Sequence, residues 1–364
     1  MSGADARFMA LALALGRRVQ GQCWPNPAVG CVIVRQGRIV GRAATAPGGR
    51  PHAEPQALAQ AGAAARGATA YVSLEPCAHH GRTPPCTDAL IAAGVARVVA
   101  PVMDCDPRVS GKGFDRLRAA GIEVVTGVCA EEAMRDLGGF LRREAGGLPH
   151  LTLKLAMSLD GRIATASGQS QWITGPQARR AVHAMRARHD AVMVGAGTAR
   201  ADDPMLTARG MGVARQPARV VVSRRLDLPL MSQLAQTARD VPLWLCHGPD
   251  PDPALAEAWD GTGARRFACG LSGRQLDMTG VLRDLGEAGL TRIFCEGGGG
   301  LAASLLAAGL VDELVVFSAG MAIGAEGLPG IGALGLEALD EARRFRLEEA
   351  RAVGGDVMSR WVKG

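Results

Sequence analysis

Residues 75–86 have the sequence EPCAHHGRTPPC, which places two cysteines and two adjacent histidines within twelve positions. About 20 residues earlier, PHAE at residues 51–54 puts His52 two positions before Glu54. A His-x-Glu followed by Pro-Cys and a second cysteine is the mark of zinc deaminases. The second cysteine is displaced here, because eight residues separate Cys77 from Cys86 instead of two. The pattern predicts a zinc-dependent deaminase domain with a long loop between its cysteines.

The residue types suit this chemistry. A tetrahedral zinc with three protein ligands keeps a fourth position open for water and lowers the pKa of that water to about 7. His52, Cys77 and Cys86 can supply the three ligands of such a site. Glu54 is then available to move protons between water and substrate. A structural zinc is the alternative, with His79 or His80 as a fourth ligand and no evident role for Glu54.

Composition limits the classes of protein that fit. A chain of 364 residues is too long for one ordinary core and suggests two domains. The formal charge is +6, and residues 1–148 carry most of it, with 17 Lys and Arg against 12 Asp and Glu. This excess suits an anionic substrate or nucleic acid. An aromatic content of 4% leaves little for bases to stack on, so nucleic acid is not the expected partner.

The cellular environment is also predicted from composition. The apolar run near the N-terminus has about ten residues, too few to cross a bilayer, and no signal-peptide cleavage pattern follows it. The nine cysteines are an odd number and are spread along the chain, which does not indicate a disulfide framework. We therefore expect a cytoplasmic enzyme without a membrane partner, and we expect a homo-oligomer.

Alternating apolar strands and short helices predict an α/β fold in both halves of the chain. A helix-breaking stretch, REAGGLPHLTL at residues 143–153, is the best boundary, and it predicts domains at 1–147 and 148–364. In the second domain, CEGGGG at residues 295–300 joins a strand to a helix, and VGAGTARADDP at 194–204 is a second such turn. Glycine-rich turns at helix N-termini favour phosphate binding, and the presence of two modestly favours a dinucleotide.

Together these motifs resemble the bifunctional deaminase/reductase family of riboflavin biosynthesis, over nearly the whole chain. The similar stretches are WPNPAVGCVIV (24–34), PHAE (51–54), ATAYVSLEPCAHHGRTPPCTDALIAAGVARVV (68–99), KLAMSLDGRIA (154–164), SGQSQWITG (167–175), RADDPMLT (200–207) and EGGGGLAASLL (296–306). The resemblance implies an N-terminal cytidine-deaminase-like three-layer domain followed by a dihydrofolate-reductase-like domain. The long loop between the cysteines is typical of this family and rare in other deaminases.

For the first domain, the resemblance implies that His52, Cys77 and Cys86 bind one Zn²⁺ and that Glu54 is catalytic. The substrate is expected to be a phosphorylated pyrimidine, 2,5-diamino-6-(5-phosphoribosylamino)pyrimidin-4-one, which loses its ring amine. Further substrate contacts are hypothesised in loops near the motif: Asn26, Arg82, Thr83 and Lys112.

For the second domain, the resemblance implies NADPH-dependent reduction of the ribosyl group to a ribityl chain. The expected cofactor contacts are Ala156, Trp172, Thr198, Asp202, Gly298, Gly299, Gly300, Leu301, Ala302, Ala303 and Ser304. The expected substrate contacts are Ser170, Arg186, Leu206, Arg209 and Glu296. Lys154 and Asp160 also match the motif. Ser223-Arg224 departs from the Asp-Ser that is common in the family, which leaves any cofactor contact there open.

A rival hypothesis stays open at this level. The zinc motif alone would also suit a nucleic-acid or nucleoside deaminase with a non-catalytic second domain. Few aromatic residues and a reductase-like second half count against it.

Overall fold

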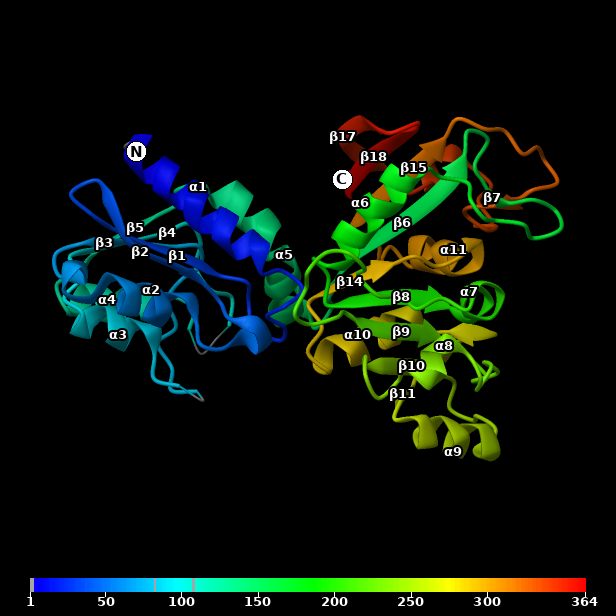
Figure 1. Cartoon of the computed structure of the whole chain (residues 1–364), viewed down its shortest axis with the longest axis horizontal. Coiled ribbons are helices and arrows are strands. Elements are labelled where there is room, and N and C mark those ends of the chain that lie inside the picture. Colours follow the sequence, from blue (N-terminus) through cyan, green and yellow to red (C-terminus); the bar gives the residue numbers. More distant parts are fainter. Residues whose placement is uncertain (1–2, 82, 107–108) are drawn as a thin grey trace. The chain divides into compact units, whose positions relative to one another are not determined.

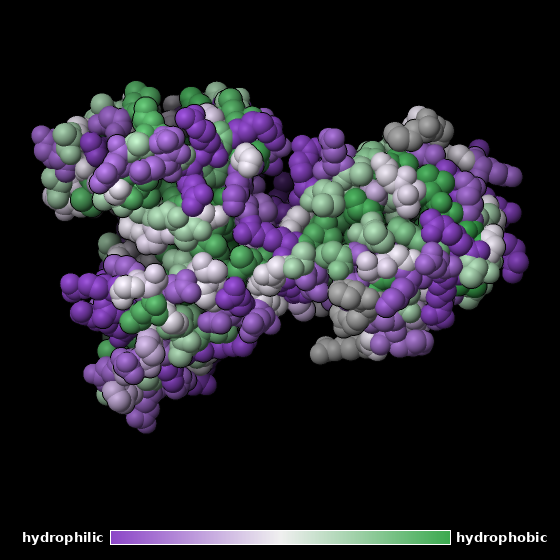
Figure 2. All heavy atoms as spheres, turned by 180° about the vertical axis from the view of Figure 1, so that it is seen from behind, coloured by the Kyte–Doolittle hydropathy of each residue, from purple (hydrophilic) through white to green (hydrophobic). Residues whose placement is uncertain are grey.

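The computed structural model of the chain describes residues 3–81, 83–106 and 109–364. It divides into two compact units, Met1–Leu148 and Pro149–Gly364. The first unit ends one residue after the domain end expected from the sequence. Among the described residues, no helix combines the length and the apolar character that a bilayer span requires. Figure 2 shows hydrophilic and hydrophobic residues interspersed on the visible face of each unit.

The first unit is built on one five-stranded sheet with the strand order β2-β1-β3-β4-β5. Strand β1 is antiparallel to both of its neighbours, whereas β3, β4 and β5 are parallel. Its strands are β1 (Gly30–Arg35), β2 (Arg38–Ala44), β3 (Thr69–Val72), β4 (Arg97–Ala100) and β5 (Glu123–Thr126). Its helices are α1 (Gly3–Arg18), η1 (Pro47–Gly49), α2 (Ala53–Ala61), η2 (Gly62–Ala65), α3 (Cys86–Ala92), α4 (Lys112–Ala119) and α5 (Ala130–Gly146).

Helices cover both faces of this sheet, which gives three layers. Helices α1 and α5 lie on one face, and α2, α3 and α4 lie on the other (Figure 1). Alternation along β1 explains the arrangement, because successive side chains of a strand point to opposite faces. Cys31 and Ile33 belong to the core cluster with α2, whereas Val32 and Val34 belong to the cluster with α1.

The second unit is built on a nine-stranded sheet with the order β11-β10-β9-β8-β14-β6-β15-β18-β17. The strands from β11 to β15 in this order are parallel, and β18 and β17 extend the edge as an antiparallel hairpin. The strands of this sheet are β6 (His150–Ser158), β8 (Ala191–Gly195), β9 (Ala218–Val222), β10 (Leu243–His247), β11 (Arg265–Ala268), β14 (Arg292–Cys295), β15 (Glu313–Ala319), β17 (Phe345–Val353) and β18 (Asp356–Lys363).

The remaining elements connect these strands. The helices are α6 (Pro176–Arg186), α7 (Ala196–Asp202), α8 (Gln233–Gln236), α9 (Pro253–Thr262), α10 (Met278–Glu287), α11 (Gly299–Ala307) and η3 (Leu339–Glu341). Short strands form two further pairs: β7 (Arg162–Ala164) with β16 (Leu328–Pro329), and β12 (Leu271–Ser272) with β13 (Gln275–Leu276). Trp259 of α9 packs in one core cluster with Val221 and Leu245, and Val182 of α6 packs in another with Phe294 and Phe317.

Several elements differ from the sequence-based expectation. The apolar pattern of residues 8–19 predicts a first helix from Phe8, whereas α1 starts five residues earlier, at Gly3. The stretch AEPQALAQAGAAARG at residues 53–67 predicts one helix ending at Gly67, whereas α2 ends at Ala61 and continues as the 3-10 turn Gly62–Ala65. Helix α5 was not predicted, because Gly138 and Gly139 interrupt its apolar pattern. The hairpin β17–β18 was also not predicted, since β17 is largely exposed and its sequence carries little apolar signal.

Candidate active sites

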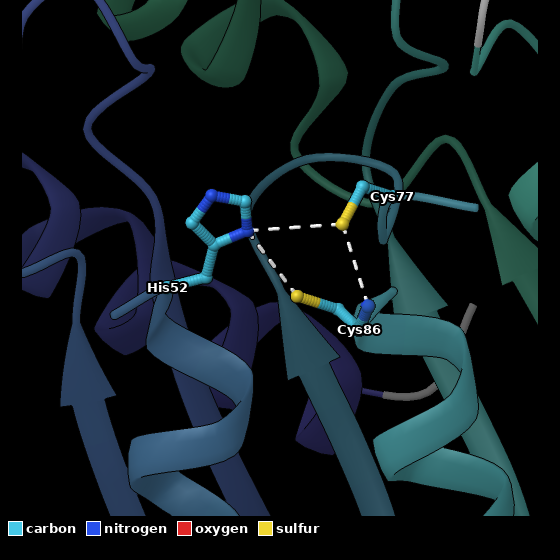
Figure 3. A group of neighbouring side chains, drawn as sticks. All are labelled: His52, Cys77 and Cys86. Atoms are coloured by element: carbon cyan, nitrogen blue, oxygen red, sulfur yellow. Dashed lines mark hydrogen bonds between the residues drawn. The ribbon is translucent and has the colours of Figure 1, made fainter. Parts of the chain in front are cut away.

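The first candidate site lies where α2 and α3 begin. His52 is the N-cap residue of α2, Cys86 is the first residue of α3, and Cys77 lies in the segment that follows β3. The side chains of these three residues converge although they come from separate segments (Figure 3). One potential ligand atom from each lies within 4.8 Å of the other two. Elements that are distant in sequence therefore bring together one imidazole and two thiols.

The donor set and its spacing fit a zinc ion. His52 Nδ1 is 3.3 Å from Cys86 Sγ and 3.7 Å from Cys77 Sγ. Tetrahedral zinc with Zn–N and Zn–S bonds of ordinary length places such atoms about 3.6 Å apart. Within the described residues, the cluster includes neither His79 nor His80. This geometry supports a three-ligand site over the four-ligand structural alternative.

The local electrostatics favour thiolate at Cys77. A hydrogen bond from the Cys86 side chain lowers the pKa of Cys77 to about 4, and His52 acts in the same direction while burial opposes it. The Cys86 N–H also donates to Cys77 Sγ over 3.3 Å. The pKa of Cys86 is raised, because its thiol donates to Cys77 and is buried. A cation between the two sulfurs would remove this asymmetry and bind both as thiolates.

Glu54 lies in the first turn of α2 and is only 3% exposed. Among the described residues, nothing hydrogen-bonds to its buried Oε2. Burial raises the pKa of Glu54, and the charge on Cys77 acts in the same direction. A buried carboxylate oxygen without a partner is costly unless a ligand completes its surroundings. This is the property expected of a proton carrier that waits for water and substrate.

The predicted substrate contacts of this site have different surroundings. Asn26 donates through Nδ2 to the Gly49 carbonyl at 2.8 Å, three residues before His52. The Thr83 hydroxyl accepts from Arg50 Nη1 at 2.5 Å, which ties the loop between the cysteines to the segment that carries His52. Lys112 begins α4 and is exposed. Arg82 lies outside the described residues. The substrate role of all four stays a prediction, and Arg50 is a cation that the sequence analysis missed.

Glu75, the first residue of the opening motif, has a structural role that its sequence context did not reveal. Its buried carboxylate accepts four backbone N–H groups over 2.9–3.3 Å. The donors are Asp104, Gly111, Gly113 and Phe114. Glu75 therefore holds the start of α4 against the segment that carries Cys77.

We expect Glu75→Ala to destabilise the first unit by about 2–4 kcal/mol, because it leaves several buried N–H groups without acceptors. Urea denaturation, monitored through the loss of deaminase activity, measures this change in stability. Asp115→Ala on the exposed face of α4 is the control. Equal midpoints for Glu75→Ala and wild type would contradict the anchoring role.

The second candidate site is centred on a partly buried ion pair in the second unit. Arg186, at the end of α6, donates through Nε and Nη2 to the two carboxylate oxygens of Glu296, at 2.5 and 3.0 Å. Lys154 Nζ on β6 lies 4.0 Å from Glu296 Oε2. Burial lowers the pKa of Lys154, whereas Arg186 lowers the pKa of Glu296 against the effect of burial. Two cations thus share one carboxylate.

Arg186 also links this group to the loop after α7. Its Nη1 donates to the Thr207 carbonyl at 3.0 Å, next to Leu206, which is buried with φ +53°. The backbone N–H of Arg209 lies 3.2 Å from His183 Nδ1, and the Arg209 side chain is exposed. Four of the five predicted substrate contacts therefore form one neighbourhood: Arg186, Leu206, Arg209 and Glu296. Among contacts between described residues, none joins Ser170 to it.

The two glycine turns lie side by side. A Cβ atom on Gly298 would be 3.4 Å from Thr198 Oγ1, and one on Gly299 would be 2.5 Å from the Pro329 carbonyl oxygen. A Cβ atom on Gly300 would meet nothing within 4 Å. The first N–H groups of α11 have no partner within their helix, so they can bind an anion such as a pyrophosphate. The turn therefore fits the dinucleotide that the sequence predicted.

The other residues predicted to contact the cofactor differ in how far they are exposed. Trp172 is 64% exposed, and the Arg179 guanidinium lies 4.5 Å above its ring. Ala302 and Ala303 are buried in the core, so only their backbone can face a ligand. The Ser304 hydroxyl donates to the Gly300 carbonyl. Ala156 lies on β6 two residues after Lys154 and is partly buried, and Asp202 is exposed at the end of α7. Their cofactor roles stay predictions.

The fold and the cluster of one histidine and two cysteines define a zinc-site deaminase unit joined to a parallel-sheet unit of the reductase type. Residues 2–102 match the family described as cytidine and deoxycytidylate deaminase zinc-binding region. Residues 149–359 match the family described as RibD C-terminal domain.

The chain belongs to the RibD family of riboflavin biosynthesis proteins. It is 43% identical to riboflavin biosynthesis protein RibD of Escherichia coli K12, over 97% of this chain and 98% of that protein. It is 37% identical to a solved Acinetobacter baumannii RibD, with a TM-score of 0.88 over 99% of both chains. A Thermotoga maritima structure is 31% identical, with a TM-score of 0.86 over 99% of both chains. That structure is described as a diaminohydroxyphosphoribosylaminopyrimidine deaminase/5-amino-6-(5-phosphoribosylamino)uracil reductase.

These comparisons confirm the family and the α/β fold class that the sequence predicted. They also confirm an enzyme with a zinc-dependent deaminase domain followed by a reductase domain. The rival hypothesis of a nucleic-acid deaminase with a non-catalytic second domain is not favoured, because the second unit matches the reductase domain over nearly its whole length.

Proposed function

We propose that this chain catalyses two consecutive steps of riboflavin biosynthesis. The first is hydrolytic deamination of 2,5-diamino-6-(5-phosphoribosylamino)pyrimidin-4-one to 5-amino-6-(5-phosphoribosylamino)uracil, with release of ammonia. The second is NADPH-dependent reduction of the ribosyl group of that product to a ribityl chain. Membership of the RibD family and the two activities given for the Thermotoga maritima structure support both steps.

In the deaminase site, His52, Cys77 and Cys86 would hold zinc, which supplies the Lewis acidity that makes water a nucleophile near neutral pH. Glu54 takes one proton from the attacking water and passes it to the ring nitrogen, and it then takes the second proton from the new hydroxyl on the carbon and gives it to the departing amine. The carbon–nitrogen bond to the amine breaks, a carbon–oxygen bond replaces it, and ammonia leaves. The unpartnered buried Oε2 of Glu54, beside the ligand cluster, carries this assignment.

In the reductase site, NADPH held at the two glycine turns would supply the hydride that the anomeric carbon receives. The bond from this carbon to the ring oxygen breaks, and the ring oxygen must take up one proton. Lys154 is the proposed donor, because its buried ammonium has a lowered pKa and therefore gives up its proton readily. Arg186 orients Glu296 beside Lys154 through two hydrogen bonds. Arg209, whose side chain is exposed in the same neighbourhood, is the proposed contact for the substrate phosphate.

A two-stage assay tests the proposal. Incubation with the diaminopyrimidine substrate and no NADPH is expected to release ammonia only. Addition of NADPH is then expected to cause its oxidation in proportion to the deaminated product. Ammonia release without any NADPH oxidation at saturating product would show that the second unit is inactive. Deamination of tRNA or DNA bases, with no turnover of the pyrimidine, would contradict the first step.

We propose further that the enzyme acts in the cytoplasm as a homo-oligomer. A reducing compartment would keep Cys77 and Cys86 available as thiolate ligands. The outer strand β17 presents an unpaired edge with the half-exposed Leu347, which suits association with another copy. A solution mass of one 37.7 kDa chain would contradict the oligomer.

A further inference from the structure

One loop of the second unit, residues 321–332, lies after β15 and runs past two parts of the reductase site; we call it the strap. Its short strand β16 pairs with β7, so the strap lies beside β7 (Figure 1). The Gly332 N–H donates to the Gly299 carbonyl at 2.9 Å, at the start of α11. A Cβ atom on Gly330 would collide with Met157 Sδ on β6. The strap therefore contacts both the glycine turn at α11 and β6, which carry predicted cofactor contacts.

Side-chain packing contributes little to the position of the strap. Within the strap only Gly327 and Gly330 are buried, and neither has a side chain. Its large apolar side chains are all at least partly exposed: those of Met321, Ile323, Leu328 and Ile331. A segment with few buried apolar contacts opens easily unless other interactions hold it. The position of the strap therefore depends on its hydrogen bonds.

The carboxylate of Asp160 binds the first half of the strap. Asp160 lies in the turn after β6, and the strap lies after β15, the parallel neighbour of β6. Asp160 Oδ2 accepts the Gly324 N–H at 2.6 Å, and Oδ1 accepts the Ile323 N–H at 3.1 Å. The hydroxyl of Ser158, which is buried, donates to Oδ1 at 2.6 Å. Ser158 therefore fixes the carboxylate in the orientation that receives the two backbone N–H groups.

These hydrogen bonds favour the charged form of Asp160. The Ser158 hydroxyl, followed by the N–H groups of Gly324 and Ile323, lowers the pKa of this carboxyl group below its usual value. Hydrogen bonds to an ionised acceptor are roughly twice as strong as those between neutral groups. An ionised carboxylate also accepts through both of its oxygens, whereas an amide has one accepting oxygen. Asp160 is therefore suited to hold an exposed loop by its backbone.

The second half of the strap has weaker support. Gly161, which has φ +77°, accepts the Gly330 N–H at 2.9 Å through its carbonyl. The strands β16 and β7 have two and three residues, and their register shifts between Leu328 and Pro329. A two-stranded pair of this kind is not stable by itself. The contact of the strap with α11 therefore depends on the hydrogen bonds to Asp160 as well.

We propose that Asp160 is a positioning residue of the reductase site, which holds the strap against the start of α11 and so fixes the glycine turn relative to β6. The inference rests on the proposed reductase function and adds a residue that acts through the strap. Gly299 belongs to the turn, and Lys154 and Ala156 belong to β6. When a binding-competent arrangement is present in only a fraction of the molecules, the apparent affinity falls by that fraction. Asp160 thus keeps the site competent to bind the reductant.

The kinetic test compares Asp160→Ala and Asp160→Asn with wild type. If the strap of Asp160→Ala is in place in about one molecule in ten to one in three, the KM for NADPH is expected to rise about three- to tenfold. The kcat is expected to change less than about twofold, because saturating NADPH selects the molecules with the strap in place. Asp160→Asn keeps one accepting oxygen and is expected to lie between Asp160→Ala and wild type. Asp277→Ala is the matched control: Asp277 accepts the Thr279 N–H at 3.0 Å at the start of α10, so its loss controls for a general decrease in stability.

Hydrogen exchange followed by mass spectrometry measures the strap directly. In Asp160→Ala, peptides that cover residues 321–332 are expected to exchange faster than in wild type, whereas peptides of β8 and β9 keep their rates. Saturating NADPH is expected to slow the exchange of the strap in this variant. Unchanged exchange of the strap would overturn the proposal. Faster exchange with an unchanged KM for NADPH would overturn it as well, because the strap would then not act on the glycine turn.

The same measurements distinguish this proposal from the alternatives. If the KM for the deaminated product rises while the KM for NADPH and the exchange of the strap stay unchanged, Asp160 contacts the substrate and the positioning role is wrong. If wild type oxidises no NADPH with the deaminated product, the reductase function itself is wrong. If wild type oxidises NADPH and the Asp160 variants share its KM and its exchange rates, only the positioning role is wrong.

Discussion

Replacing Glu54 by glutamine is expected to slow deamination by a factor of about 10²–10⁴ while the protein still binds about one zinc per chain. Glutamine has nearly the same shape but cannot take a proton from water. The proposed ligands, His52, Cys77 and Cys86, are untouched, so metal content is expected to persist. Ammonia release measures the activity, and metal analysis of the purified protein measures the zinc.

Two controls make this result specific. Glu123→Gln removes an exposed carboxylate from β5 of the same unit and is expected to leave both the rate and the zinc content unchanged. The Glu54→Gln protein is also expected to oxidise NADPH normally when it is given the deaminated product, because the second site has its own residues. Loss of zinc from Glu54→Gln would contradict its assignment as a proton carrier outside the ligand set.

Replacing Lys154 by methionine is expected to slow reduction by a factor of about 10²–10⁴, while deamination continues at the wild-type rate. Methionine fills a similar volume but has no proton to give to the sugar ring oxygen. Removal of the ammonium leaves Glu296 with Arg186, its bidentate partner, so the fold of the site is expected to survive. NADPH oxidation with supplied deaminated product measures the effect. The matched control is Lys363→Met, because Lys363 is exposed and its Nζ donates to the Gly309 carbonyl, so this change is expected to leave the rate unaltered.

The pH dependence of reduction distinguishes a proton donor from a structural lysine. Burial lowers the pKa of Lys154, Arg186 acts in the same direction, and Glu296 opposes them. The protonated amine is the active form, so the rate is expected to fall as pH rises through this lowered pKa, before an ordinary lysine would titrate. Lys154→Met is expected to lose this alkaline limb. An unchanged pH profile in the variant would assign Lys154 to packing or binding instead.

The deaminase ligands could be predicted from sequence because they belong to short motifs. His52 and Glu54 are two residues apart, and Cys77 and Cys86 are joined by a characteristic loop. The structure brings the imidazole and the two thiols together, and the family comparison agrees with the zinc-binding class. Their individual roles remain to be tested by substitution.

The role of Glu75 could not be predicted in the same way. Its carboxylate binds backbone N–H groups that follow it by 29 to 39 positions, and backbone groups carry no side-chain signature. Arg50 was missed for a similar reason, because its contact with Thr83 depends on how two loops approach each other. In both cases the sequence contains the residue but does not indicate which group it contacts.

Local patterns in the chain were enough to predict the two α/β domains and the zinc motif, because apolar periodicity and short spacings are properties of neighbouring residues. Only the folded domain shows which charged side chains of the second unit lie together. Lys154, Arg186 and Glu296 are distant in the chain, and they meet because β6 and β14 are adjacent in the sheet and α6 packs on it. The contact of Asp160 with the strap depends likewise on the pairing of β6 with β15. Sheet order brings these side chains together, and it follows from the packing of the whole domain.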